Sequence, residues 1–313
     1  MNTELSPRRI PVWIFAALGV FLATLPIWSG AYAQSIGRSV LTYMVLALSW
    51  DMLVRSGQLS FGIAGFFGLG SYAGALASNY WQMPGVLTLL FAGIVVGLVA
   101  FVLGALVLRL RGMYFAITTL ALAEIFRIVI RNWTGFTGGP NGTLLPNVAF
   151  GGDSLSTYLL MVVLAALAIG ASEWFRHGRL HFALTAIRNN ETVAKSSGIS
   201  IYRYLVIAFV ITSGIQGVAG ASYAQQFGFV MPESSFNVNY TLIPLAMTLL
   251  GGMYGTWGSV VGAILLGVVG EFLKLFIPYG HLVVYGVIIV LVLLFMRQGI
   301  VGLVRSWIRR EKA

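Results

Sequence analysis

Long apolar runs separated by short polar turns make up most of this chain. About 20 helical residues, rising ~1.5 Å each, are needed to cross the hydrocarbon core of a bilayer, and each run is close to that length. The run at 240–276 is about twice as long and is interrupted at 251–255, which indicates two spans, the first short or broken. The pattern therefore predicts about ten transmembrane helices, at residues 12–29, 36–53, 59–79, 86–108, 113–130, 157–175, 204–227, 240–276 (two spans) and 281–295.

One long polar stretch, residues 176–203, interrupts this pattern with five basic residues (Arg176, Arg179, Arg188, Lys195 and Arg203) and one acid, Glu191. Between residues 180 and 198 its spacing is that of a short amphipathic helix, which Gly198 is expected to end. Glu191 precedes Lys195 by four residues, the favoured order for a helical ion pair. The apolar strip and the charged strip of this helix consist of Ala183, Ile187 and Ala194, and of Arg188, Glu191 and Lys195, respectively.

Two interpretations of this stretch remain open. A basic amphipathic helix can lie on anionic lipid headgroups. Alternatively, it is a docking loop for a partner protein, in which a groove of the partner would bury Ile187 and Ala194.

The composition excludes a soluble protein. With 58% hydrophobic and 9% charged residues, and a mean hydropathy of +0.89, the chain has too few charges to cover a water-facing surface. We therefore predict a single transmembrane domain over residues 1–313, an all-α integral membrane protein. The net charge of +10 lies at the ends of the apolar runs, where it meets membrane lipid, so nucleic acid is not an expected partner.

The distribution of the basic residues predicts the orientation in the membrane. Fifteen of the 19 fall in turns on one side of the predicted spans, including 176–203 and a basic tail at 297–313, and by the positive-inside rule this side is cytoplasmic. Both termini are then cytoplasmic, and the polar loop 132–156 is on the outer side. Ala31-Tyr32-Ala33 resembles a signal-peptidase site, and cleavage after Ala33 would leave the remaining topology unchanged.

Residues that could carry chemistry are few. The chain contains no cysteine and three scattered histidines, so no metal site is expected. No Gly-x4-Gly-Lys-Ser/Thr run occurs, and therefore any use of ATP must come from a partner. No set of side chains has the spacing of a catalytic site, and we expect a protein that is not an enzyme and holds no cofactor of its own.

Polar side chains inside the predicted spans are the remaining candidates. Gln58 and Ser60 stand at a glycine-flanked start of a span, where they could line a water-filled path. Glu124 and Arg127, with Arg131, recur on one face of the fifth span, either as an ion-paired brace or as a polar lining at the outer mouth of the path. Asp51 and Arg55, four residues apart, are interpreted as a simple interfacial pair.

Several motifs together resemble the LivM-type permeases of branched-chain amino-acid ABC importers. They cover nearly the whole chain between about residues 36 and 300. They are GQLSFG at 57–62, FFGLGSY at 66–72, LRLRGMYFAITTL at 108–120, TGGPNG at 137–142, AIRNNE at 186–191 and LGGMYGTWG at 250–258.

This resemblance implies a multi-pass subunit of the bacterial inner membrane. Its expected partners are a LivH-like second permease, two cytoplasmic ABC ATPases that bind ATP and Mg, and a periplasmic solute-binding protein. The resemblance also implies that a cytoplasmic coupling helix, here 186–198, contacts the ATPases. Its relatives carry branched-chain amino acids or other small amino acids, amides or carboxylates. The alternative is a self-sufficient carrier driven by an ion gradient, for which Glu124 and Glu271 are the available acids.

Overall fold

The computed structural model describes residues 30–276, 283–284, 286–287, 290 and 299–303. The expected span 12–29 lies outside the described residues, as do most of the span 281–295 and most of the basic tail 297–313. Within the described part, the long helices are α2 (Ala31–Val54), α3 (Ile63–Trp81), α4 (Gly85–Val107), α5 (Met113–Asn132), α7 (Ser154–His177), α10 (Ile201–Phe227), α12 (Asn239–Gly251) and α13 (Thr256–Phe276).

Five of these helices, α4, α5, α7, α10 and α13, are long and apolar enough to cross a membrane. The chain is therefore an α-helical, multi-pass membrane protein, as the apolar runs predicted. The helix bounds agree with the predicted spans to within a few residues. The two largest differences are at span starts. Helix α2 begins at Ala31 rather than at residue 36, and α3 begins at Ile63 rather than at residue 59.

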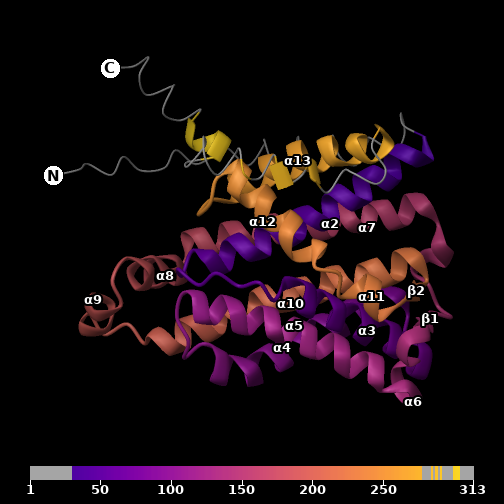
Figure 1. The fold of residues 1–313 in the computed structure, drawn as a ribbon, viewed down its shortest axis with the longest axis horizontal. Coiled ribbons are helices and arrows are strands. Elements are labelled where there is room, and N and C mark those ends of the chain that lie inside the picture. Colours follow the sequence, from indigo (N-terminus) through magenta and orange to yellow (C-terminus); the bar gives the residue numbers. More distant parts are fainter. Residues whose placement is uncertain (1–29, 277–282, 285, 288–289, 291–298, 304–313) are drawn as a thin grey trace.

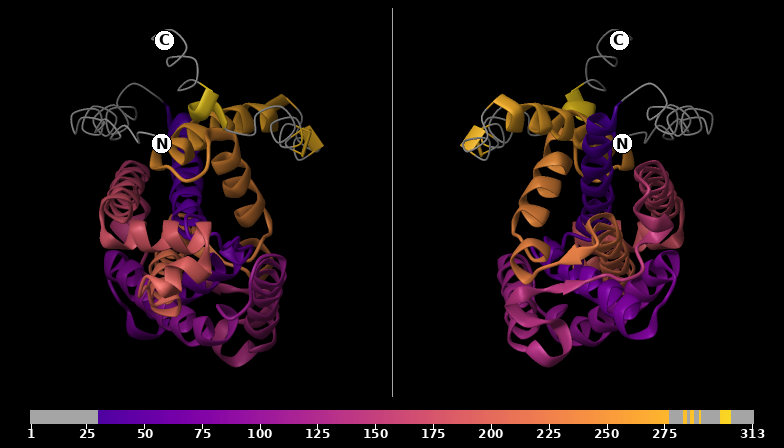
Figure 2. Two further views of the ribbon diagram at one scale, coloured as in Figure 1. Left: turned by 90° about the vertical axis from the view of Figure 1, so that its left-hand side faces the viewer. Right: turned by 90° about the vertical axis from the view of Figure 1, so that its right-hand side faces the viewer.

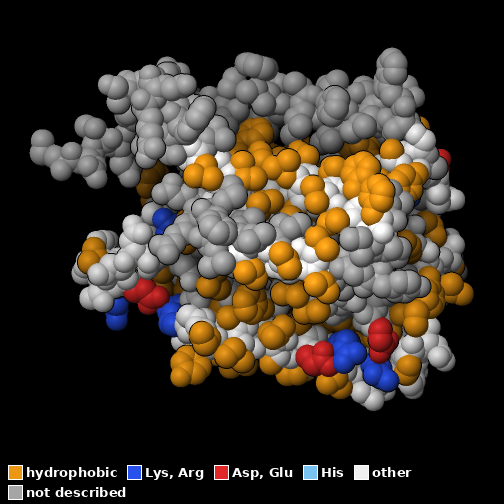
Figure 3. Space-filling view, turned by 45° about the horizontal axis from the view of Figure 1, so that its top comes forward, with side chains coloured by type: hydrophobic (Ala, Val, Ile, Leu, Met, Phe, Trp, Pro, Cys, Tyr) orange, Lys and Arg blue, Asp and Glu red, His pale blue; other side chains and the backbone are white. Residues whose placement is uncertain are grey.

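The long helices run along the longest axis of the molecule, and the short elements cap its two ends (Figure 1). Helices α8 (Arg179–Asn189) and α9 (Glu191–Ser196) lie at one end, and α6 (Thr134–Thr137), β1 (Thr143–Leu144) and β2 (Phe229–Val230) lie at the other (Figure 2). On the face drawn in Figure 3, charged side chains gather towards these two ends with hydrophobic side chains between them. This distribution fits a bilayer that surrounds the middle of the molecule.

The loop predicted for the outer side contains more structure than its polar sequence indicated. It holds α6, the 3-10 helices η1 (Gly139–Asn141) and η2 (Ala149–Gly152), and β1. Strand β1 pairs antiparallel with β2, with Thr143 opposite Val230 and Leu144 opposite Phe229. The pairing ties the loop to the chain that follows α10, just before α11 (Pro232–Ser235).

Helix α10 packs closely against α3 and α4 because glycines face one another in the contact. A Cβ atom on Gly70 of α3 would meet the backbone of Gly217, and one on Gly220 would meet the backbone of Phe67. Small residues of this kind let two helix backbones approach inside a membrane, where no hydrophobic effect drives helices together. The buried core surrounds this contact and extends between α2, α7, α12 and α13.

The run 240–276 forms two antiparallel helices, which confirms the predicted break. Helix α12 has 13 residues and contains Pro244, and the non-helical residues 252–255 connect it to α13. The two backbones are in direct contact, since a Cβ on Gly251 or on Gly262 would clash with the opposite helix. Helices α12 and α13 therefore form one tightly packed hairpin.

Candidate coupling segment and translocation cleft

The stretch predicted as one amphipathic helix is two helices, α8 and α9, which we call the docking segment (residues 179–196). Asn190 separates them in an extended conformation, with φ −162° and ψ 111°, and its side-chain Oδ1 accepts hydrogen bonds from the backbone N–H groups of Thr192, at 2.9 Å, and Val193, at 3.2 Å. The prediction of a single helix is therefore wrong. Asparagine is a strong N-cap residue, and its cap begins a new helix where continuous helical periodicity had suggested none.

The apolar strip of the docking segment faces the interior of its own chain. Ala183, Ile187 and Ala194 are 4%, 2% and 2% exposed, and Ile187 and Ala194 belong to a core cluster with Phe175 and Phe209. The expectation that a partner would bury Ile187 and Ala194 is wrong, because other parts of the same chain already bury them. The opposite face of the docking segment is exposed, with Phe182 72% and Val193 58% accessible.

The charged strip makes contacts with other elements. Glu191 pairs with Arg111, which follows α4, at 2.9 Å, where the sequence had predicted a pair with Lys195. Lys195 is exposed. Gly198 ends the segment with φ +79°, as predicted, since a left-handed residue after a helix favours glycine.

Arg188 is the link between the docking segment and the membrane helices. Its guanidinium carbon lies 4.1 Å from the centre of the Tyr254 ring, in the turn between α12 and α13. Gly57, in the turn after α2, has φ +84° and lies so close that a Cβ there would come within 3.5 Å of the Arg188 backbone. The docking segment therefore rests directly on two turns of the membrane domain.

His181 lies on the partly buried side of α8. Burial lowers the pKa of its imidazole from the ordinary value of 6.5, and the positive charges of Arg55, Arg188 and Arg176 lower it further. The neutral imidazole is therefore the stable form near pH 7.

Asp51 and Arg55 form a buried cluster and not the simple interfacial pair that their spacing suggested. The Asp51 side chain is fully buried, and the Arg55 side chain is 2% exposed. Arg55 donates from Nε at 3.0 Å and from Nη2 at 2.7 Å to Asp51 Oδ2. It also donates to the carbonyl and the hydroxyl of Ser172 in α7, at 3.0 and 2.7 Å, and to the Thr256 hydroxyl of α13, at 3.4 Å.

The other oxygen of the Asp51 carboxylate accepts a hydrogen bond from the backbone N–H of Tyr254 at 2.6 Å. Asp51 and Arg55 thus join α2, α7 and the α12–α13 turn at the end of the molecule that carries the docking segment. A buried ion pair is tolerated when hydrogen bonds satisfy its remaining donors and acceptors, and this one has them. One feature of the sequence could have indicated this burial: Asp51 lies inside an apolar run, with three apolar residues between it and Arg55.

A second group of charges lies at the opposite end of the molecule. Glu124 and Arg127 of α5 form the predicted ion pair, through two hydrogen bonds. Glu233 of α11 joins them, 3.7 Å from Arg127 and 3.4 Å from Arg131. The brace therefore links two elements, and the sequence did not reveal Glu233 because it is far away along the chain. Unlike Asp51, these acids are about half exposed.

A cleft of about 420 Å³ opens beside this outer cluster. Its walls come from the start of α3, from α5 and from the chain around α11 and α12. They are apolar except for the side chains of Glu124 and Thr241, with Phe61, Ile117, Leu120, Phe236 and Val238 among the lining residues. Such a cleft can hold an apolar side chain against its walls and a charged group at Glu124.

The irregular segment 57–62 lies next to the cleft, and several of its polar groups form hydrogen bonds within the protein, whereas Gln58 Oε1 is buried without a hydrogen-bond partner among the described residues. The Phe61 N–H donates to the Thr119 hydroxyl at 2.9 Å, and the Ser60 carbonyl accepts from the Trp50 indole at 2.8 Å. Gln58 and Ser60 are each 3% exposed and do not line the cleft. Of the predicted path residues, the structure brings Glu124 and Arg127 together and places Gln58 and Ser60 in the interior.

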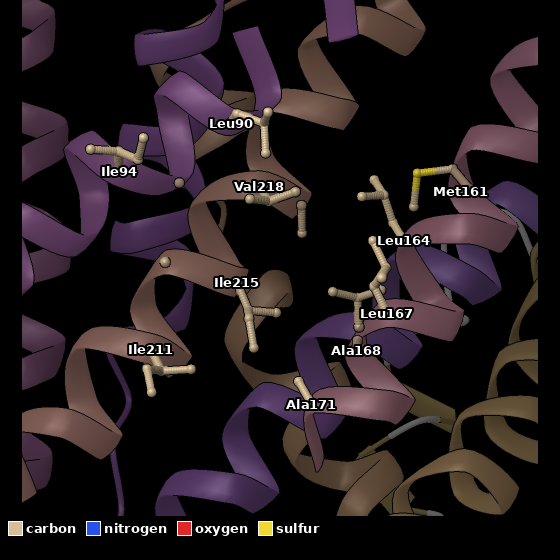
Figure 4. A pocket seen from close by; sticks show the side chains of 14 residues that line it. Leu90, Ile94, Met161, Leu164, Leu167, Ala168, Ala171, Ile211, Ile215 and Val218 are labelled. Atoms are coloured by element: carbon tan, nitrogen blue, oxygen red, sulfur yellow. The ribbon is translucent and has the colours of Figure 1, made fainter. Parts of the chain in front are cut away.

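A groove on another side of the molecule has a different chemistry. It has a volume of about 420 Å³ and lies between α4 and α7, with residues of α2 and α10 also lining it (Figure 4). The lining side chains labelled there, among them Leu90, Met161, Leu164 and Ile215, carry no polar group that could bind a charged solute. Burying a charged solute without such partners is unfavourable, so the lining of this groove does not fit a charged solute.

A family model described as "branched-chain amino acid transport system / permease component" matches residues 32–293 of this chain. The match covers the two charged clusters, the cleft and the docking segment. The chain belongs to this permease family.

Relatives support the same assignment. The chain is 32% identical to the high-affinity branched-chain amino acid transport system permease protein LivM of Salmonella typhimurium, over 94% of this chain and 75% of the relative. It is 29% identical to the autoinducer 2 import system permease protein LsrC of an Enterobacter species, over 85% and 78%, and 25% identical to the permease protein LivH of Escherichia coli, over 83% and 91%. No solved structure shows a significant match.

Membership of this permease family makes the chain a transport component and not an enzyme. The alternative of a carrier driven by an ion gradient has no support from the relatives, which are named as permease proteins of a transport system and of an import system. The two acids proposed for ion coupling are also engaged, Glu124 with Arg127 and Glu271 with Lys274, at 2.6 Å in the second case. An acid that already neutralises a cation is a poor site for a coupling ion.

Proposed function

We propose that this chain is the LivM-like membrane subunit of an ATP-driven importer for branched-chain amino acids or a related small amino acid, amide or carboxylate. The observation that carries the proposal is the family match, which spans nearly all of the described residues. A LivH-like permease would complete the membrane unit, and a periplasmic binding protein would deliver the solute. Because the chain has no P-loop, two partner ATPases would bind ATP and Mg.

In this proposal the chain crosses the inner membrane about ten times, with both termini in the cytoplasm. The end of the molecule that carries Arg55, Arg111 and the docking segment is then cytoplasmic, and the end that carries β1 and β2 is periplasmic. The excess of basic residues at the first end supports this orientation.

Labelling with a membrane-impermeant thiol reagent tests this orientation, because the chain has no cysteine and single cysteines can be placed at Ser196 and at Ser156. Ser156→Cys should react in intact cells and Ser196→Cys only after lysis.

The docking segment is the proposed contact with the ATPases, and Phe182, Val193 and Lys195 supply its free surface. Ala183, Ile187, Ala194 and Gly198 then shape the segment, and Arg188 and Glu191 hold it to the membrane domain. Exposed apolar side chains next to a basic residue are typical of a protein interface and are costly to leave in water.

The complete importer in liposomes tests the function. Uptake of a branched-chain amino acid should require ATP, the ATPases and the binding protein, and a proton or sodium gradient alone should drive none. Accumulation driven by a gradient through this chain alone would refute the proposal.

Substitution on the docking segment tests the contact. Phe182→Asp with Val193→Asp should leave membrane insertion intact and abolish co-purification of the ATPases. Phe150→Asp is the matched control, since Phe150 is an exposed aromatic residue, 54% accessible, in η2 of the loop that carries β1. Retention of the ATPases by the double variant would remove the docking assignment, and loss in the control would show a general folding defect.

The cleft at Glu124 and Arg127 is the proposed contribution of this chain to the path of the solute. A charged pair on α5, about 16 Å along the helix from its first residue, is costly to expose to lipid and is stable beside water or protein. Gln58 and Ser60 are buried next to the cleft and belong to the segment 57–62, whose Phe61 forms part of the cleft wall. Leu120→Trp should narrow the cleft and lower uptake without changing ATPase binding, and Leu106→Trp on the exposed face of α4 is the control.

A further inference from the structure

The turn between α12 and α13 combines three unusual features that the family assignment does not explain. Tyr254 has φ +67°, in the left-handed region, where a bulky residue is strained. Its backbone N–H donates to the fully buried carboxylate of Asp51, at 2.6 Å. Its ring lies under the guanidinium of Arg188, at 4.1 Å. Glycines at 252 and 255 on both sides of the strained residue would allow the turn to take up other conformations.

These contacts form a continuous series from the docking segment to the membrane helices. Arg188 belongs to the docking segment, and Tyr254 belongs to the turn. Asp51 with Arg55 anchors that turn to α2, and Arg55 continues to Ser172 of α7. Every link is a charged hydrogen bond or a cation over an aromatic face, which are among the stronger polar contacts in proteins.

The α12–α13 hairpin, which is the last element in this series of contacts, is suited to move as one body. Helices α12 and α13 are packed backbone to backbone through Gly251, Gly258 and Gly262. Helix α12 is short and contains Pro244, which removes a backbone hydrogen bond. A force applied at the turn would therefore shift the hairpin as a unit. Thr241 of α12 also lines the cleft beside Glu124, so such a shift would reach the cleft.

We propose that Arg188 and Tyr254 transmit the movement of the docking segment to the α12–α13 hairpin, with Asp51 and Arg55 as the buried anchor of the turn. Both are positioning residues for transport, and neither touches the solute. The inference rests on the proposed function, because it assigns a path to the coupling between ATP hydrolysis and uptake.

The test measures uptake per ATP hydrolysed in the complete importer with its ATPases and binding protein. Tyr254→Leu and Arg188→Gln should each lower this ratio about tenfold while the ATPases still co-purify and hydrolyse ATP. Tyr254→Phe keeps the ring and should retain the ratio of the parent. Tyr202→Leu is the matched control, since Tyr202 is 47% and Tyr254 is 45% exposed. A purely structural role would lower assembly and hydrolysis together and leave the ratio unchanged.

A second variant keeps the proposal testable if Tyr254→Leu fails to assemble. The chain has no cysteine, so Arg188→Cys with Tyr254→Cys can be joined by a flexible bifunctional thiol reagent. The double variant should be uncoupled, and cross-linking should restore uptake per ATP, because the linker replaces the lost contact. The proposal is overturned if the cross-linked protein stays uncoupled or if Tyr254→Leu has the ratio of the parent. A parent importer without ATP-dependent uptake would instead overturn the proposed function.

Discussion

Two ion pairs with nearly the same sequence pattern have opposite environments in this molecule. Asp51 and Arg55, at i and i+4, lie in the interior with hydrogen bonds to α7, α13 and the α12–α13 turn. Glu124 and Arg127, at i and i+3, lie on a helix surface with an acid side chain that is 53% exposed. Spacing along a helix therefore shows that two charges can meet, but not whether other helices cover them.

The difference separates a charge pair that holds helices together from one that remains accessible. At the inner pair, loss of one partner leaves an uncompensated charge in a low dielectric, which is strongly destabilising. At the outer cluster, solvent screening reduces the contribution of each pair to stability. The same accessibility leaves the Glu124 carboxylate, paired with Arg127, exposed where it lines the cleft.

The largest expected effect is at the inner pair. Asp51→Ala leaves the Arg55 guanidinium buried without its carboxylate, and should lower the free energy of unfolding by about 3–5 kcal/mol. Thermal unfolding in detergent, followed by loss of the monodisperse species, measures this change. The double variant Asp51→Leu with Arg55→Leu removes both charges and should recover much of the loss. Equal instability of the single and double variants would show that the volume of the side chains, and not their charge, matters.

A smaller effect on stability is expected at the outer cluster. Glu233→Ala removes the acid that bridges α11 to Arg127 and Arg131, and should change the stability by less than about 1 kcal/mol. Uptake should fall more than stability does, because this acid helps to position Arg127, which pairs with Glu124 at the wall of the cleft. The same melting assay and an uptake assay measure the two quantities. A melting temperature as low as that of Asp51→Ala would contradict the contrast between the clusters.

Salt distinguishes the two regions directly. The Debye length falls from about 10 Å at 0.1 M salt to about 3 Å at 1 M, so exposed charges are screened and buried ones are not. The effect of Glu233→Ala on melting should therefore disappear between these concentrations, whereas that of Asp51→Ala should persist. A loss of the Asp51→Ala effect at high salt would mean that water reaches the inner pair.

The smallest expected effect concerns pH and extends the contrast to His181 beside the inner cluster. Burial and the positive charge of Arg55 hold the pKa of His181 below 6.5, so the unfolded segment binds a proton that the folded segment excludes. The stability should therefore fall as the pH drops below about 6.5, and should be constant above it. His181→Gln should flatten the profile, measured by melting between pH 5 and 7.5. An unchanged slope in this variant would assign the pH dependence to other groups.

The amino-acid sequence was enough to predict the long helices and the family of this protein. Apolar runs of sufficient length leave few alternatives to helices in a membrane, because every backbone polar group there needs an internal partner. The break in 240–276 was predictable from its glycines, and the Glu124–Arg127 pair from local spacing. The six motifs, taken together, also indicate the permease family.

Only the tertiary structure decided which faces of these helices are covered. The strip with Ala183, Ile187 and Ala194 would have the same sequence pattern whether a partner or the chain itself buried it. In the structure, the chain itself buries these residues. Asn190 divides a segment whose periodicity is continuous, and Glu233 and Tyr254 reach residues that are more than a hundred positions away in the sequence. Helical periodicity shows in which direction a side chain points from the axis of its helix. Burial and long-range pairing depend on how the helices pack together.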